Sequence, residues 1–488
     1  MRISGSVRIF RSALPLTFCA ALLLAGCGLM PPAAVKLPEP RLLAAFVIMG
    51  ENGTAWARAV TAASTAGPAD AICPVITVDG RAQRMAVRAA AANVPRQKVA
   101  SDAVDSNSKP ANFPVLACEF SLPQKAARAS IGGVELPVPK ANPRRIVLLG
   151  DTGCRMKQAE NAWQACNDES KWPFRAVADS AASLAPDLVI HVGDFHYREN
   201  PCPPGMPGCQ GSPWGYGWDT WDADLFKPAA KLLAAAPWIV ARGNHEECRR
   251  AGQGWFRFLD PQPFEELRSC NDAKNDLVGN FSPPYAVPIS SDQQFIVFDS
   301  NVAGHAPLDL SKAGDVHALA EYRRQFARVD ELAGKAGVKS MFINHHLILA
   351  YALDAKVGLV GGSPSQLTAM KSRHSLAYYP PTVQLAVHGH VHLFEAINFS
   401  SNHPAAIVSG MGGTEADPDL PDPFPMHIGP AEGVTLESIT HSSRFGFAVM
   451  ERKESTWEIS AYDHHGVRTT TCILTGAKLR CDKTGLLK

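Results

Sequence analysis

The chain has 488 residues, with 47 Lys and Arg against 46 Asp and Glu, which leaves a formal net charge of +1. This balance argues against a dedicated nucleic-acid or anionic-membrane surface. A chain of this length is too long to form a single domain of ordinary size, and a hydrophobic content of 46% is sufficient to form extensive hydrophobic cores.

Residues 1–26 are expected to be an export signal. Its basic start contains Arg2, Arg8 and Arg11, and the apolar core over 13–25 is shorter than the ~20 residues that span a bilayer. The stretch Leu24-Ala25-Gly26-Cys27 resembles the lipobox of bacterial lipoproteins. The resemblance implies cleavage before Cys27 and acylation of that cysteine, so lipid would anchor the chain. A soluble secreted protein with an incidental cysteine is the alternative.

The residues after the signal fit a lipid-anchored location in a bacterial cell envelope. Gly28 stands where an aspartate commonly retains such lipoproteins at the inner membrane. The outer membrane is therefore favoured, with the protein facing the periplasm or the cell surface. Residues 27–40 are rich in Pro and Ala and are predicted to be a tether.

Ten of the 12 cysteines remain once Cys19 leaves with the signal and Cys27 takes lipid. An even number in an oxidising compartment suggests up to five disulfides, although the sequence leaves their connectivity open. The alternative, a thiolate zinc site, is disfavoured because the sequence contains no Cys-x-x-Cys pair. Pairing of nearest neighbours would give Cys73–Cys118, Cys154–Cys166, Cys202–Cys209, Cys248–Cys270 and Cys472–Cys481.

Residues 41–140 are predicted to form a small, mostly β domain. Two strand-like runs, 75–78 and 84–87, flank Asp79-Gly80, which is a strong hairpin signal. No set of chemically active residues occurs in this region. A spacer, or a cap over a site elsewhere, is therefore the expected role.

Residues 141–488 alternate strands with helices and are predicted to be the catalytic domain. An apolar stripe over 174–184 predicts one helix, and a second is expected to start at Asp315 as its N-cap. A Pro/Gly/Trp-rich insertion over 198–222 could be a wall of a pocket or disulfide-pinned decoration. Three antiparallel strands are expected over 445–474.

Five short apolar runs in this region each end in polar residues. Such runs are typical of buried strands, and the carboxyl ends of parallel strands are where α/β sheets bind ligands. Carboxylate, amide, phenol and imidazole groups gathered at one edge indicate a two-metal hydrolytic site. The motifs are Gly150-Asp151-Thr152-Gly153, Gly193-Asp194-Phe195-His196-Tyr197, Gly243-Asn244-His245-Glu246, Ile343-Asn344-His345 and Gly389-His390-Val391-His392.

In this order the motifs resemble those of the calcineurin-like metallophosphoesterases. The first motif of that superfamily is usually Asp-x-His, whereas this chain has Gly153 and places Tyr197 three residues after the second aspartate. That exchange resembles the purple acid phosphatase branch. The resemblance covers about residues 144–462 and implies an α/β fold, a metallophosphoesterase β-sandwich flanked by helices.

The resemblance also implies the ligands of two metal ions. Asp194 would bridge both ions, because one carboxylate can contact cations ~3.5–4 Å apart. A phenolate favours Fe(III) at the first position, and the second accepts Zn, Mn or Fe(II). The first ion would take Asp151, Asp194, Tyr197 and His392, and the second would take Asp194, Asn244, His345 and His390.

The implied reaction is hydrolysis of phosphate esters, with a metal-bound hydroxide attacking phosphorus in line. His245 would stabilise the transferring group or protonate the leaving alkoxide. The substrate would be a phosphorylated small molecule or a nucleotide. A phosphodiesterase or nucleotidase on the same site is an alternative, and a non-catalytic surface-binding lipoprotein is disfavoured because every ligand is retained.

The other histidines near the motifs have more ordinary expected roles. His388 is expected to pack beneath its motif, and His346 to orient a ligand or to lie in the core. The remaining ones are expected at the surface: His196, His305, His374, His464 and His465.

Overall fold

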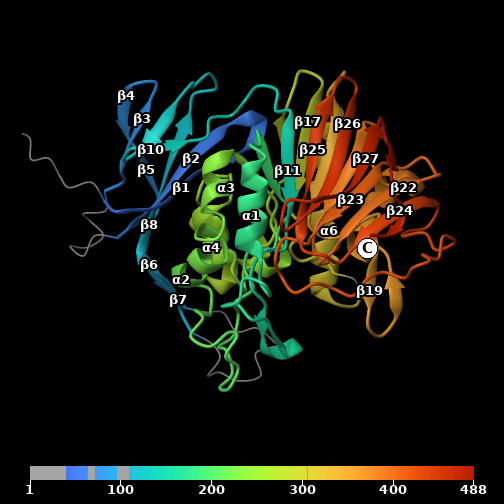
Figure 1. Ribbon diagram of the computed structural model, residues 1–488, viewed down its shortest axis with the longest axis horizontal. Helices are drawn as coiled ribbons and strands as arrows, with labels where there is room; N and C mark the ends of the chain where they lie inside the picture. Colours follow the sequence, from blue (N-terminus) through green and yellow to red (C-terminus); the bar gives the residue numbers. More distant parts are fainter. Residues whose placement is uncertain (1–39, 64–71, 96–108, 305, 488) are drawn as a thin grey trace, which may run out of the picture. The chain divides into compact units, whose positions relative to one another are not determined.

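The structure, a computed structural model, describes residues 40–63, 72–95, 109–304 and 306–487 (Figure 1). The predicted export signal, most of the tether and Cys27 lie outside these ranges. Among the helices of the described ranges, none is long and apolar enough to cross a membrane.

The larger of two main sheets has 11 strands. Its centre is formed by three parallel strands, β11, β14 and β15, in which nearly every residue is buried. Such continuous apolar runs occur because both faces of the sheet are covered. In spatial order the strands are β28 (Lys478–Cys481), β27 (Arg468–Thr475), β26 (Thr456–Asp463), β25 (Gly446–Lys453), β11 (Arg145–Leu149), β14 (Leu188–His191), β15 (Trp238–Val240), β1 (Leu42–Met49), β2 (Ala55–Ala62), β8 (Val115–Leu122) and β5 (Ala86–Ala89).

The second main sheet has eight strands and contains the other two predicted motif strands, β18 and β21. These two are parallel neighbours, so their carboxyl ends meet at the same edge. In spatial order the strands are β16 (Tyr285–Pro288), β17 (Gln293–Phe298), β18 (Lys339–Asn344), β21 (Val383–His388), β23 (Ala405–Ser409), β22 (Phe394–Phe399), β24 (Leu436–Ser442) and β29 (Gly485–Leu486).

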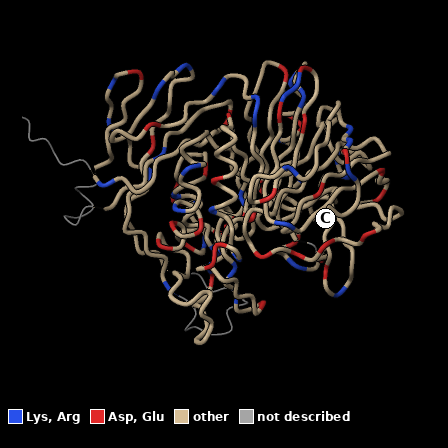
Figure 2. Tube along the Cα trace, viewed as in Figure 1, with Lys and Arg blue, Asp and Glu red and all other residues tan. Residues whose placement is uncertain are grey.

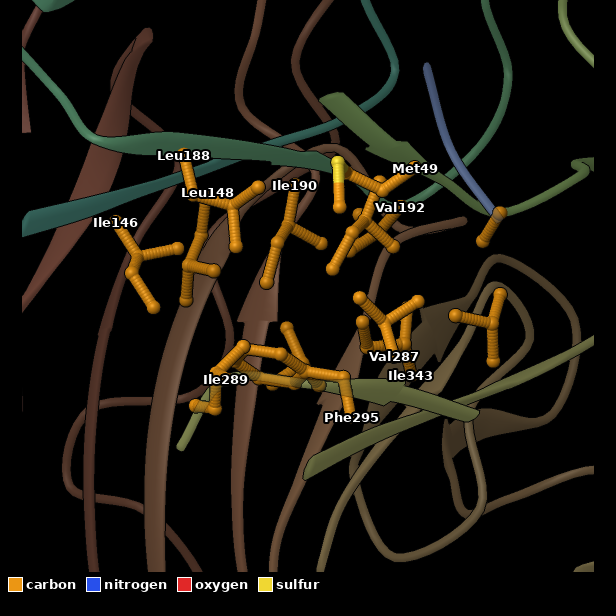
Figure 3. Packing of buried hydrophobic residues seen from close by; sticks show 14 of the residues in the cluster. Met49, Ile146, Leu148, Leu188, Ile190, Val192, Val287, Ile289, Phe295 and Ile343 are labelled. Carbon is orange, nitrogen blue, oxygen red and sulfur yellow. The ribbon is translucent and has the colours of Figure 1, made fainter. Parts of the chain in front are cut away.

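The two sheets pack face to face around one hydrophobic core. Ile190 of β14 and Leu148 of β11 point from the larger sheet toward Phe295 and Ile343 of the second sheet (Figure 3). All four side chains are fully buried. Burial of this apolar area is the main term that holds the sheets together, at roughly 25 cal/mol per Å².

Helices cover the outer faces of the sandwich. α1 (Phe174–Ser183), α3 (Ala230–Ala235) and α4 (Gly252–Phe258) pack on the larger sheet, and α6 (Ala313–Ala333) and α7 (Pro364–His374) pack on the second (Figure 1). The predicted α/β fold, a β-sandwich flanked by helices, is confirmed.

The start of α6 differs from the prediction. The helix begins at Ala313 with Lys312 as its N-cap, and not at Asp315. The Asp315 carboxylate instead accepts the backbone N–H of Asp309 at 2.8 Å. Because that carboxylate serves the preceding turn, it does not cap its own helix.

The region 41–140 is mostly β, as predicted, and it joins the larger sheet. β1 pairs in parallel with β15 at Ile48 and Trp238. Residues 39–488 also cluster as one unit. Strands from both sides of residue 140 therefore share a sheet, and the domain division predicted there stays a prediction. The predicted hairpin at Asp79-Gly80 joins β3 and β4 of a small four-stranded sheet, whose strands are β10 (Val134–Leu136), β9 (Ala129–Ile131), β3 (Val75–Val78) and β4 (Arg81–Arg84). The second strand of the hairpin is therefore 81–84 and not the predicted 84–87, because Ala86–Ala89 forms β5 of the larger sheet.

The described chain contains five disulfides, and each joins nearest-neighbour cysteines. The sequence had left other connectivities open, so the structure selects one of them. The disulfide pairs are Cys73–Cys118, Cys154–Cys166, Cys202–Cys209, Cys248–Cys270 and Cys472–Cys481.

Charged residues of both signs are interspersed along the trace (Figure 2).

Candidate metal centre

The loops that follow β11, β14, β15, β18 and β21 meet at one edge of the sandwich. Each strand ends within a few residues of its motif, so the backbone delivers every predicted ligand to the same place. Contacts between their side chains, given below, show that all seven come together. They are Asp151, Asp194, Tyr197, Asn244, His345, His390 and His392.

The first group of ligands surrounds the hydroxyl of Tyr197. This oxygen lies 3.1 Å from Asp151 Oδ1, 2.9 Å from Asp194 Oδ2 and 3.0 Å from His392 Nε2. The four side chains are almost completely buried. They are the four residues that the resemblance implied for the first metal ion.

The second group surrounds the side-chain oxygen of Asn244. Asn244 Oδ1 lies 3.2 Å from His345 Nε2 and 3.0 Å from His390 Nδ1. His345 Nε2 also lies 3.1 Å from Asp194 Oδ2, the same oxygen that contacts Tyr197. Asp194 therefore belongs to both groups, as expected of a bridging carboxylate.

The spacing of these donors fits metal coordination. Ligand bonds of about 2.1 Å at right angles place neighbouring donor atoms about 3 Å apart. The six separations given above are 2.9–3.2 Å, and His392 Nε2 lies 3.8 Å from Asp151 Oδ1. The oxygen-rich first group suits a hard cation, and the mixed oxygen and nitrogen second group suits Zn, Mn or Fe(II).

Three of the seven residues have backbone conformations that side chains other than glycine rarely adopt. The φ angles are +55° for Asp151, +54° for Asp194 and +73° for His390. Such conformations cost of order 1–3 kcal/mol each and cluster at functional sites. The surrounding packing thus holds these side chains at an energetic cost.

Hydrogen bonds to backbone carbonyls orient two of the imidazoles. His345 Nδ1–H donates to the carbonyl of Val192 at 2.8 Å, and His392 Nδ1–H donates to that of Glu415 at 2.7 Å. Each bond fixes the proton on Nδ1 and leaves Nε2 as a lone pair that faces the site. Neutral imidazole in this tautomer is the form that binds a metal.

The buried acidic groups of the two donor groups create an electrostatic environment that favours bound positive charge. Burial, followed by the neighbouring Asp194, raises the pKa of Asp151 well above its usual range. Burial and both aspartates likewise raise the pKa of the Tyr197 phenol. Burial opposes ionisation of Asp194 too, and its pKa lies well below the usual value only where positive charge at His345 and His245 offsets that burial. Cations would relieve the cost of two buried carboxylates and a phenol.

His245 faces both groups without joining them. Its Nε2 lies 4.0 Å from Asp194 Oδ2, and its ring centroid lies 3.7 Å from that of Tyr197. Burial, followed by the charge of Arg250, lowers the pKa of His245 to about 3, against the opposing effect of Asp194 and Glu199. The imidazole is therefore neutral at physiological pH and directs Nε2 toward the donors.

Glu246 has a structural role that the sequence interpretation did not assign. Its carboxylate accepts the backbone N–H groups of Asp194, Phe195, His196 and Gly243 at 2.9–3.1 Å. These bonds fix the loop that carries the bridging aspartate to the loop that carries Asn244. Its position directly after Asn-His in the motif was the available signal.

Of the other histidines, His388 lies where it was expected and His196 does not. His388 is buried beneath its motif, as expected, and its Nδ1 contacts the carbonyl of Asn344 at 3.1 Å. The ring of His346 lies 4.1 Å from that of His390. The surface position expected for His196 is wrong, because the insertion folds over this side chain and buries it completely against Tyr216 and Trp221.

The fold and the site together define a metallohydrolase with an α/β sandwich. A model of the calcineurin-like phosphoesterase family matches residues 144–394. The chain belongs to this family, and it is a metal-dependent hydrolase of phosphoric esters. Among curated proteins no sequence matches it.

A solved structure shows the same fold at low sequence identity. A structure titled PhoD is 12% identical, with a TM-score of 0.51 over 93% of this chain and 94% of that chain. This likeness supports the fold. A purple acid phosphatase, PPD1, from seeds of yellow lupin (Lupinus luteus) is also 12% identical, with a TM-score of 0.49 over 92% of this chain and 74% of that chain.

Proposed function

We propose that this protein is a dinuclear-metal phosphatase that resembles the purple acid phosphatases. The observation that carries the proposal is the shared carboxylate. Asp194 Oδ2 contacts the phenol of the first group at 2.9 Å and His345 of the second at 3.1 Å. One oxygen common to two donor groups suits two neighbouring cations better than one.

The steric surroundings of Gly153 support the tyrosinate branch of the family. A Cβ atom at this position would lie 2.7 Å from the backbone nitrogen of Tyr197 and 2.8 Å from Asp224 Oδ2. The histidine that usually occupies this place has no room here. Tyr197 supplies an oxygen donor to the first group instead, and a phenolate donor favours Fe(III).

Two cations held by the donor groups around Tyr197 and Asn244 would supply water of lowered pKa and would neutralise charge on the phosphoryl oxygens. The chain's own residues do the remaining work. His245 directs Nε2 at the donors from a buried position, where a hydrogen bond to the transferring phosphoryl group is stronger than in water. The Glu246 carboxylate accepts backbone N–H groups from the loop of Asp194 and the loop of Asn244, and these hydrogen bonds hold the two loops in fixed relative positions during the reaction.

The test is turnover by the purified protein, reconstituted with Fe(III) and with Zn, Mn or Fe(II). The substrate panel contains phosphomonoesters, phosphodiesters and nucleotides. We expect monoesters to give the highest kcat/KM. A preference for diesters or nucleotides would replace the acid-phosphatase assignment with the phosphodiesterase or nucleotidase alternative. Full metal loading without turnover of any ester would instead support a binding protein.

His245→Ala is the matched control for this experiment. Because His245 contacts the donors without belonging to either group, we expect this variant to bind both metals and to lose roughly 10²–10³-fold in kcat. Metal analysis and kinetics on the same preparation measure the two effects separately. Loss of metal in this variant would show that His245 is a ligand.

We also propose that acylation of Cys27 anchors the protein to the bacterial outer membrane. The sequence Leu24-Ala25-Gly26-Cys27 supports this, and the five disulfides agree with an oxidising compartment. Mass spectrometry of the mature N-terminus from membrane fractions tests it. An unmodified end at any other residue would contradict the proposal.

A further inference from the structure

A buried ion pair lies directly behind His245. The guanidinium of Arg250 places Nη2 against Nδ1 of the His245 imidazole and also against Oε1 of Glu199. Its Nη1 donates to the backbone carbonyl of Asn244 at 3.0 Å. Arg250, Glu199 and His245 are each less than 10% exposed. The arginine thus contacts both residues of the Asn-His pair on the side away from the donors.

The insertion over 198–222 supplies the acidic half of this pair. Glu199 Oε2 accepts a hydrogen bond from the hydroxyl of Tyr216 at 3.2 Å. Backbone bonds tie both ends of this segment together, since Gly215 N–H donates to the carbonyl of Arg198 at 2.8 Å. The Cys202–Cys209 disulfide closes the loop between them. The insertion therefore holds the Glu199 carboxylate through the hydroxyl of Tyr216.

A second disulfide fixes the short segment that carries Arg250. Cys248 stands two residues before the arginine and is joined to Cys270. The backbone N–H of Arg250 donates to the carbonyl of Glu247 at 2.9 Å. The side chain is consequently rigid at its base and paired at its tip. Such preorganisation lowers the cost of holding a catalytic group in one orientation.

The chemistry of arginine decides the direction of the hydrogen bond to His245. A guanidinium has five N–H donors, has no acceptor and stays charged in proteins. Contact between Arg250 Nη2 and Nδ1 of His245 is therefore a hydrogen bond only if Nδ1 has a lone pair. The single proton of the neutral imidazole then resides on Nε2. Nε2–H points toward the donors that would hold the metals.

We propose that Glu199 and Arg250 are positioning residues, which orient His245 so that Nδ1 accepts a hydrogen bond from Arg250 and Nε2 carries the proton. In this form His245 donates a hydrogen bond to the transferring phosphoryl group. The inference rests on the proposed phosphatase function. It also gives the insertion a role, because Glu199 and Tyr216 belong to it. The opposite arrangement has Nδ1–H donating to Glu199 Oε1, which lies 2.9 Å away.

A set of variants distinguishes the two arrangements by kcat on a phosphomonoester. Arg250→Met removes the donor, and we expect it to lower kcat by roughly 10²-fold. Arg250→Lys returns a donor and should recover to within about tenfold of wild type. Glu199→Gln still accepts from Arg250 and Tyr216 and should cost about tenfold or less. A greater loss in Glu199→Gln than in Arg250→Met would overturn the proposal and favour donation to Glu199.

A double variant tests whether Arg250 acts through His245. If it does, Arg250→Met adds no further loss of kcat to His245→Ala, because coupled residues are not additive. Independent, multiplying losses would refute the proposal. Metal content and melting temperature are measured for every variant. Arg145→Met is the matched control, since it breaks the Arg145–Glu451 ion pair at the other end of β11 and should leave kcat unchanged.

One readout does not depend on turnover. The ¹⁵N shifts of the His245 ring in the zinc-loaded protein report which nitrogen carries the proton. We expect the Nε2–H form in wild type and a shift toward a mixed population in Arg250→Met. An Nδ1–H form in wild type would refute the inference even if the protein hydrolysed phosphate esters. Absence of ester hydrolysis with the Nε2–H form present would contradict only the proposed function.

Discussion

Replacement of Gly243 by alanine tests how tightly the bridging aspartate is packed. A Cβ atom on residue 243 would lie 2.1 Å from Asp194 Oδ1 and 2.2 Å from the backbone nitrogen of Asp194. Ordinary Cβ contacts are not shorter than 3.0 Å. Both atoms belong to a buried residue and are fixed, because the backbone N–H of Asp194 donates to Glu246 and Asp194 Oδ1 accepts the backbone N–H of His245. The methyl group therefore cannot be accommodated unless this loop moves.

The size of the effect follows from the displacement. Separation of the Cβ and Oδ1 atoms to 3.0 Å requires a shift of about 1 Å, and a misplacement of ~1 Å at a catalytic centre can cost ~10²-fold in rate. We expect Gly243→Ala to lose about 100-fold in kcat/KM, or roughly 2.7 kcal/mol of transition-state stabilisation. Overpacking should also lower the free energy of unfolding by about 1–3 kcal/mol.

The assay combines metal analysis, kinetics on a phosphomonoester and thermal unfolding. Gly314→Ala is the control, because a Cβ there meets nothing within 4 Å and the residue lies in α6. Alanine in a helix should be neutral or stabilising by up to about 1 kcal/mol. A Gly243→Ala protein with both metals and wild-type kcat/KM would refute the close approach of residue 243 to Asp194.

Three further predictions use other parts of the structure. Asp194→Asn should lose more metal and more activity than Asn244→Ala, because only Asp194 belongs to both donor groups; equal metal loss in both variants would contradict its bridging role. Iron-loaded wild type should absorb visible light through phenolate charge transfer, and Tyr197→Phe should abolish this band; an unchanged spectrum would exclude Tyr197 as a ligand. Burial raises the pKa of Glu395 well above its usual range, so the folded state retains a proton that the unfolded state loses as pH rises. The wild type then loses stability as pH increases above about 4.5, and Glu395→Gln should melt at a higher temperature than wild type at pH 8 but not at pH 4.

The five motif strands could be predicted because their signal is local. Each is a short apolar run followed by its ligands, as in β11, which ends at Leu149 directly before the Gly150-Asp151 motif. Parallel strands that share a sheet bring their carboxyl ends together without further information. The resemblance to the purple acid phosphatases implied that Tyr197 lies beside Asp151 and His392, and the structure has it there.

The residues that support the site could not be predicted in this way. Glu199, Arg250 and Tyr216 come from two loops, and their contacts depend on how an insertion folds over its neighbours. No periodicity indicates such a contact. Similarly, the pairing of Ile48 with Trp238 joins strands that are far apart in the sequence, so residues 41–140 resembled a separate unit.

The strand order has a consequence for how the chain folds while it is being synthesised. β11 lies between β14 and β25, and its pairing with β25 joins Arg145 to Glu451. All five disulfides, in contrast, close loops of 7 to 45 residues. Four of the five precede β25 in the sequence, so these crosslinks can form while one edge of β11 still has no partner. An unpaired strand edge is a template for aggregation, so β25, which is synthesised late, protects this edge of the sheet.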